Sequence, residues 1–206
     1  MEKRFSLENI ISGTQRTITR FPLSVFTALL ATATALVLFD DQNFPSLVKL
    51  LLTLVLVFPL SVGVTAFGEH YNSKIKASLV GAVVLFAVTY YFFIARNFIE
   101  YEQLKYYIQY GLWILASVSV ATFLPFLKQQ TVRALDFWFY NQRIVYAFLA
   151  TFIYSAVLFI GLVVAMTSFS FLFDITFGVE PFELWIMVVG IFCPLFFLSR
   201  YPSVQD

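Results

Sequence analysis

The sequence has few charged residues, one histidine and one cysteine. Of its 206 residues 12% are charged, whereas soluble domains carry about 25%. Cys193 has no second cysteine with which to form an internal disulfide. His70 and the adjacent Glu69 are too few ligands for a zinc site, which usually needs about three or four. With no Gly-rich phosphate loop and a net charge of +1, we expect no cofactor, no metal site and no nucleic-acid partner.

The sequence contains long apolar runs that carry no charged residue. Hydrophobic residues make up 60% of the chain and aromatic residues 19%, and about 20 apolar residues suffice to cross a bilayer as a helix. The charge-free run from Ile144 to Phe173 is too long for one crossing, so we end that span near Met166 and expect a loop or surface segment over Ser168 to Phe182. The predicted spans are about 21–39, 50–68, 77–95, 106–127, 144–166 and 184–198.

These runs predict an all-α fold. We expect one domain over residues 1–206, an integral membrane helical bundle with five or six transmembrane helices plus short interfacial amphipathic helices. The last span is the shortest and contains Pro194. The first span could also be read as a cleavable signal peptide, because the small residues at 31–35 resemble a cleavage site, but its apolar run continues to Phe39.

No Asp, Glu, Lys, Arg or His lies in the middle of any predicted span. Burying a charge in the bilayer costs about 2.5 to 3.5 kcal/mol or more, so intramembrane acids and bases usually mark function. The hydroxyls of Ser61, Ser117 and Ser155 have no base in the same segment that could activate them. We therefore expect no enzyme. Two acidic pairs, Asp40 with Asp41 and Glu180 with Glu183, leave open a divalent-cation site.

Basic residues are sorted to one side of the predicted bundle. If both termini lie inside, ten of the thirteen basic residues fall in inner segments. Short inner loops of membrane proteins are enriched in Lys and Arg, so we expect a cytoplasmic N-terminus. Residues 1–20 form a candidate amphipathic segment on the inner surface.

The stretch RALDFWFYNQRIV, residues 133–145, joins the fourth and fifth predicted spans. Its helical periodicity places Asp136, Tyr140 and Arg143 on one polar stripe, and aromatic residues occupy the rest, which is typical of an interfacial helix. The side chains could reach lipid phosphates or turn inward to meet the first and second spans. The candidate lipid-headgroup contacts are Arg20, Arg133, Asn141 and Arg143.

Small residues and prolines within the spans have two interpretations. Pairs such as Ser117 with Ala121 and Gly161 with Ala165 favour close helix packing. Proline inside a span frees a backbone carbonyl, and broken helices mark binding sites in many transporters. The three prolines in question are Pro59, Pro125 and Pro194.

Three segments resemble the bacterial proteins grouped as domain of unknown function 4153. They are RTITRFPLSVFTALLATATALVLF, LLTLVLVFPLSVGVTAFGEHY and FWFYNQRIVYAFLATFIYSAVLFIGLVVAM. The shared pattern is Arg-Phe-Pro at the mouth of the first helix, here residues 20–22, and an aromatic element with Trp138 and Asn141 before a long apolar helix. The resemblance implies a multi-pass protein of the bacterial cytoplasmic (inner) membrane, brings no activity with it, and implies further helices after FFLSRYPSVQD.

Packing faces without buried chemistry predict a non-enzymatic membrane module or a subunit of a membrane complex. Its partners would be the lipid bilayer and other membrane helices, or a C-terminal continuation of the chain. The alternative is a transporter or permease for a lipid-like or weakly polar substrate, with the proline-broken helices around its path.

Overall fold

The computed structural model describes residues 15–40, 44–69, 73–94, 104–127, 134–174 and 180–202, and these contain helices and no strand. This confirms the predicted all-α fold. Residues 15–20 are helical and lead through a bend at Phe21 into the first long helix. The elements are α2 (Pro22–Asp40), α3 (Pro45–Gly68), α4 (Ser73–Thr89) with the π-helical turn η1 (Tyr90–Ile94), α6 (Leu104–Phe123) with the 3-10 turn η2 (Leu124–Phe126), α7 (Ala134–Phe173), α8 (Pro181–Met187), the π-helical turn η3 (Val188–Phe192) and α9 (Cys193–Ser199).

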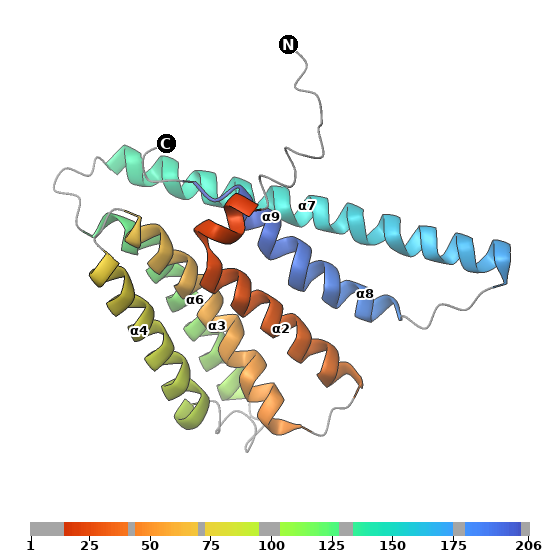
Figure 1. The fold of residues 1–206 in the computed structure, drawn as a ribbon, viewed down its shortest axis with the longest axis horizontal. Helices are drawn as coiled ribbons and strands as arrows, with labels where there is room; N and C mark the ends of the chain where they lie inside the picture. Colours follow the sequence, from red (N-terminus) through yellow and green to blue (C-terminus); the bar gives the residue numbers. More distant parts are fainter. Residues whose placement is uncertain are drawn as a thin grey trace, which may run out of the picture.

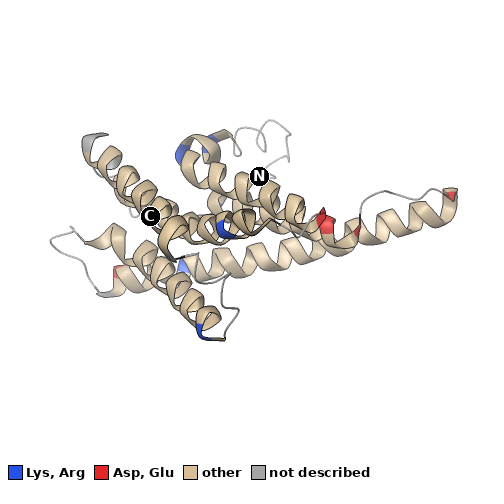
Figure 2. Ribbon diagram, turned by 90° about the horizontal axis from the view of Figure 1, so that it is seen from below, with Lys and Arg blue, Asp and Glu red and all other residues tan. Residues whose placement is uncertain are grey.

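Five of the helical segments are long and apolar enough to cross a membrane, which agrees with the predicted five or six spans. A sixth apolar helix, Ala77–Phe93, is shorter. Charged residues are few on the ribbon, and long stretches of helix carry none (Figure 2). The long segments are Pro22–Asp40, Pro45–Gly68, Leu104–Phe126, Leu135–Phe173 and Pro181–Ser199.

Helix α3 lies at the centre of a four-helix half of the molecule, where it packs against α2, α4 and α6 (Figure 1). The second half consists of α7 and the helical segment α8–η3–α9, which packs between α7 and α2. Helix α7 runs across one end of the four-helix half and then extends well past the other helices (Figure 1). The chain therefore forms a packed bundle with one long helix projecting from it.

Small residues bring the central helices close together. Ser24 on α2 and Ser61 on α3 are fully buried, and their hydroxyls hydrogen-bond across the interface at 2.8 Å. A Cβ added to Gly63 would lie 2.5 Å from the Ala121 Cα on α6. Only glycine, which has no side chain, permits this approach. The resulting van der Waals contacts stabilise helix packing in lipid, where the hydrophobic effect does not drive helices together. The packing role predicted for Ser117 and Ala121 is confirmed, because both are buried against α3.

The structure corrects the prediction for the fifth span. The expected interfacial helix and the expected span at 144–166 are one continuous helix of 40 residues, α7. Part of the predicted loop over Ser168 to Phe182 is also helical, because α7 continues to Phe173 and α8 begins at Pro181. No proline or glycine interrupts the chain between Gly161 and Asp174. Helix α7 ends where Asp174 adopts a φ of 53°, the left-handed conformation that commonly follows the last turn of a helix.

The three prolines lie in three different local structures, and not all of them interrupt a helix. Pro59 lies inside the continuous helix α3, whereas Pro125 is buried in the short turn η2. Pro194 is at the start of α9, directly after the π-helical turn η3. Wider π turns commonly accommodate such local disruption of the helical hydrogen bonds. The last segment is helical from Pro181 to Ser199, longer than the predicted 184–198.

Candidate functional site

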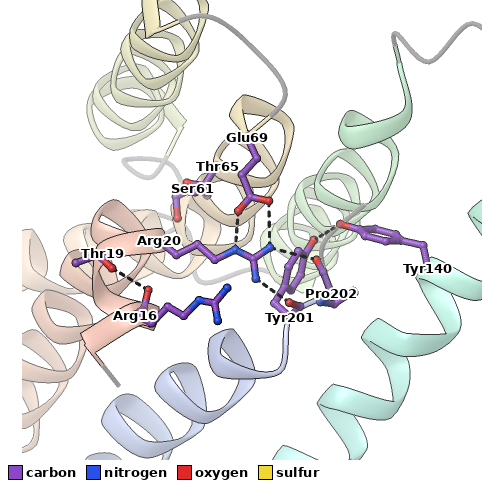
Figure 3. A network of polar contacts seen from close by, with 9 residues as sticks. All are labelled: Arg16, Thr19, Arg20, Ser61, Thr65, Glu69, Tyr140, Tyr201 and Pro202. Carbon is purple, nitrogen blue, oxygen red and sulfur yellow. Dashed lines mark hydrogen bonds and ion pairs between the residues drawn. The ribbon is translucent and has the colours of Figure 1, made fainter. Parts of the chain in front are cut away.

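The main polar site joins four chain segments around Arg20, immediately before α2 (Figure 3). Its guanidinium donates from Nε to Glu69 Oε1 at 2.5 Å and from Nη2 to Glu69 Oε2 at 3.1 Å. It also donates from Nη1 to the Tyr201 carbonyl at 3.0 Å and from Nη2 to the Pro202 carbonyl at 3.5 Å. The hydroxyl of Tyr140 on α7 donates to that of Tyr201 at 3.1 Å. We call Arg20, Glu69, Tyr140, Tyr201 and Pro202 the Arg20 network.

Aromatic side chains hold this network in place. Phe21 is fully buried and packs edge-on against Tyr201, with 5.7 Å between ring centroids. Phe126 packs edge-on against Tyr140 at 5.0 Å. Pro22 occupies the first turn of α2, where its missing N–H costs no helical hydrogen bond. The sequence Arg-Phe-Pro thus supplies an ion-pair partner, a core side chain and a helix start in three consecutive positions.

Burial and hydrogen bonds engage the polar groups of the Arg20 network. Burial raises the pKa of Tyr201 above its ordinary value of 10.0, although the hydrogen bond from Tyr140 and the positive charge of Arg20 oppose this shift. Its phenol therefore stays protonated at neutral pH. The carboxylate of Glu69 is neutralised by a two-pronged contact with Arg20, the geometry in which a guanidinium binds a carboxylate most strongly.

The four residues predicted to contact lipid headgroups differ in their surroundings. The Arg20 guanidinium faces Glu69 and two carbonyls, so it is engaged within the protein. Asn141 donates to the Phe137 carbonyl one turn earlier, and Arg143 is exposed. Arg133 lies outside the described residues. Helix α7 does not bring Asn141 or Arg143 to Arg20.

Tyr201 is the network residue for which the sequence indicated no site. The polar stripe with Asp136 and Tyr140 was predicted either to face headgroups or to turn inward toward Arg20 and Glu69. Of these two stripe residues, Tyr140 is 5% exposed and turned inward, whereas Asp136 is exposed. Tyr201 follows the last helix and is equally buried. A charged residue at each inner span end, such as Arg20 and Glu69, was the available signal. Periodicity within one helix cannot identify a partner 61 residues away.

The alternative polar sites do not assemble among the described residues. These residues contain no group of three or more His, Cys, Asp or Glu that could hold a metal ion. Glu180 and Glu183 form a reciprocal capping box at the start of α8, in which the Glu180 N–H donates to Glu183 Oε2 at 3.1 Å. Asp41 and His70 lie outside the described part of the chain.

The three serines considered as nucleophiles are hydrogen-bonded within or between helices. Ser61 contacts Ser24, as described above, and Ser117 donates to the Ile114 carbonyl at 2.8 Å. Ser155 accepts a hydrogen bond from the Cys193 thiol at 2.8 Å. Serine in membrane helices commonly satisfies its hydroxyl in these ways. Their contacts are those of packing residues.

An apolar groove of about 340 Å³ lies between α3, α4 and α6. Both α4 and α6 pack against α3, and the rings of Phe86 and Trp113 meet 6.0 Å apart where α4 approaches α6. The lining contains no charged side chain, and its one hydroxyl, on Ser117, is bonded to its own helix. Leu60, Val64, Leu79, Ala82, Val83, Phe86, Trp113, Ala116, Ser117, Val120 and Leu124 line it.

The outer half of α7, residues 156–173, is the second apolar feature. Tyr140, Ala147, Thr151 and Ser155 are the buried residues of this helix, and none of the residues after Ser155 is buried. Phe159 still touches Trp185 on α8, with ring centroids 4.9 Å apart. Nearer the C-terminal end of α7, large side chains are exposed, and Phe171 is 92% exposed.

These features define a multi-pass helical membrane protein, with five membrane-length helices, an internal ion pair at one end and apolar outer surfaces. Comparison with protein-family models gives no match. Comparisons with curated proteins and with solved structures likewise give none.

Proposed function

We propose that this protein is a non-enzymatic module of a membrane assembly, and that the outer half of α7 binds helices of a partner. The observation that carries the proposal is the length and exposure of α7. Its charge-free stretch from Ile144 to Phe173 covers 30 positions, about 45 Å of helix at 1.5 Å per residue. The hydrocarbon core is about 30 Å thick, and transmembrane helices usually tilt by about 20°. This helix has more apolar surface than one ordinary crossing covers.

Small residues on α7 support helix contact as the means of covering that surface. Gly161 and Ala165, which have the spacing of a helix-packing pair, are both exposed. A Cβ added to Gly161 would meet nothing within 4 Å. The corresponding pair on α6, Ser117 and Ala121, is buried against α3. One predicted packing pair is thus used inside the bundle, and the other is available to a partner helix.

Orientation and location are part of the same proposal. If successive helices cross the membrane in alternate directions, the helix ends on the side of the Arg20 network carry more basic than acidic described residues, and the helix ends on the other side carry more acidic ones. This agrees with a cytoplasmic N-terminus in a bacterial inner membrane, and membership of the domain of unknown function 4153 group stays a prediction. The first set of helix ends carries Arg16, Arg20, Arg143, Arg200, Glu69 and Asp136, and the second set carries Lys49, Lys105, Asp40, Asp174, Glu180 and Glu183.

The test is photo-cross-linking in native membranes, with benzoylphenylalanine placed at Val164 on α7. We expect discrete protein adducts that disappear when Gly161→Trp is added. The matched control is Gly111→Trp on α6, because Gly111 is also exposed and has nothing within 4 Å. Lipid adducts alone at Val164, or protein adducts unaffected by Gly161→Trp, would refute a partner site on α7.

The alternative function is a transporter or permease for a lipid-like or weakly polar substrate, which the apolar groove between α3, α4 and α6 favours. Purified protein reconstituted alone in liposomes separates the two functions. Movement of a defined solute or lipid across the bilayer would contradict the non-enzymatic module and support transport. Absence of movement together with α7 adducts would support the module.

A further inference from the structure

The apolar groove between α3, α4 and α6 has the size of a site for a small ligand. Its volume of about 340 Å³ falls within the range of roughly 300 to 1,000 Å³ that ligand pockets occupy. A helix is about 10 Å wide with its side chains and rises 5.4 Å per turn, so one turn fills roughly 400 Å³. The groove could enclose less than one such turn, so a docking helix would lie over it and insert only side chains.

The chemistry of the lining selects a hydrocarbon. No lining side chain is charged, and the Ser117 hydroxyl is already bonded to the Ile114 carbonyl. Apolar cavities exclude water and take up apolar molecules. The groove lies along the C-terminal half of α3, at Leu60 and Val64, within a helix that is apolar enough to cross a membrane. Acyl chains are the molecules present at that depth in a bilayer.

The walls distinguish this groove from the general surface that faces lipid. Three helices form it, and Val83 and Ser117 in its lining are nearly inaccessible to solvent, at 6% and 4% exposure. Alanines on two helices, Ala82 on α4 and Ala116 on α6, leave the space that larger side chains would fill. We propose that the groove binds one acyl chain of a membrane phospholipid, in contact with the indole ring of Trp113.

The primary test uses the whole protein in dioleoylphosphatidylcholine vesicles that contain a phosphatidylcholine with a photoreactive diazirine in its acyl chain. We expect the mapped adducts to concentrate on groove residues relative to the exposed face of α7. The pair Ala82→Phe with Ala116→Phe fills the groove and should remove that enrichment. The matched pair Ala77→Phe with Ala33→Phe, at exposed positions outside the groove and outside the proposed partner surface of α7, should keep it.

A second measurement tests the proposal without the double-phenylalanine variant, in case that variant does not fold. Trp138→Phe and Trp185→Phe leave Trp113 as the only tryptophan, and phosphatidylcholine brominated on its acyl chain should quench its fluorescence. Single Ala116→Leu should reduce the quenching, whereas single Ala33→Leu, at an exposed position outside the groove, should not. The proposal is overturned if quenching is the same in both variants, or if diazirine adducts are spread evenly over all exposed helices.

A helical occupant gives a different result. Benzoylphenylalanine at Ala116 in native membranes would then form protein adducts instead of lipid adducts, which would assign the groove to a second copy or another protein and overturn lipid binding. The α7 cross-linking test concerns the other half of the molecule, so either proposal can fail while the other holds.

Discussion

Replacing Arg20 with alanine removes a side chain whose hydrogen bonds tie the start of α2 to the end of α3 and to the residues after α9. Four hydrogen bonds are lost, two to the Glu69 carboxylate and two to the carbonyls of Tyr201 and Pro202. The Arg20 and Glu69 side chains are 27% and 26% exposed, so solvent screens part of the attraction. We assign about 1 kcal/mol to the ion pair itself.

The two carbonyl contacts add to this loss. A hydrogen bond from a charged donor contributes about 1.5 to 3 kcal/mol where water cannot replace it, and the contact to Pro202 is long at 3.5 Å. We therefore expect Arg20→Ala to lower the free energy of unfolding by about 2 to 3 kcal/mol. Arg20→Lys should recover about half of that, because an ammonium keeps the charge but cannot make the forked contact.

The assay is reversible unfolding in mixed micelles by SDS titration, followed by far-ultraviolet circular dichroism. A double-mutant cycle with Glu69→Ala should give a coupling of about 1 kcal/mol between the two residues. Hydrogen exchange adds a local readout at the amides of Arg200 and Tyr201, which bond to the carbonyls of Phe197 and Leu198. Arg20→Ala should accelerate that exchange because the C-terminal segment loses its tether.

Arg16→Ala is the control, since Arg16 lies one turn earlier and is exposed. It should leave unfolding and exchange near the wild-type values. If Arg20→Ala behaves like Arg16→Ala, or if the Arg20–Glu69 coupling is zero, the network does not hold the helix ends together and the reasoning is refuted.

Two further predictions concern the bundle. Gly63→Ala should lower the free energy of unfolding by about 1 to 3 kcal/mol, because its Cβ would lie 2.5 Å from the Ala121 Cα. The control is Gly111→Ala, which has open space around it and corrects for the higher helix propensity of alanine. Equal effects of the two changes on stability would contradict the close packing at Gly63. The raised pKa of Tyr201 predicts that stability is full below about pH 10 and falls as pH rises through the native pKa, since the unfolded phenol ionises first. Tyr201→Phe should flatten this decline in an SDS titration repeated across alkaline pH, and an unchanged slope would exclude Tyr201 as its cause.

The spans could be predicted because crossing a bilayer is a property of each segment. Long charge-free runs fall on α2, α3 and α6, and a shorter one falls on the helix from Pro181 to Ser199. The end of the fifth helix could not be predicted in this way. The expected stop near Met166 came from bilayer thickness, whereas the helix continues as long as its local sequence favours helix, up to Asp174.

The Arg20 network lay beyond sequence reasoning for a different reason. Arg20 was singled out as a charged residue at the mouth of a span, and phosphate was its expected partner. Its actual partner, Glu69, is 49 residues away and becomes a neighbour because α2 and α3 pack antiparallel through Ser24 and Ser61. Tyr140 points inward, where its hydroxyl donates to that of Tyr201 in the segment after α9. Pairings of this kind depend on how helices assemble.

The sequence by itself determined the class of protein, since hydrophobicity, helix length and the scarcity of charge are additive along the chain and require no knowledge of neighbours. Tertiary structure alone decided which polar side chains meet, which small residues are used inside the bundle, and which apolar surfaces remain open. Those outcomes depend on distances between residues far apart in the chain. The Arg20 network, the groove beside Trp113 and the exposed outer half of α7 are three such outcomes.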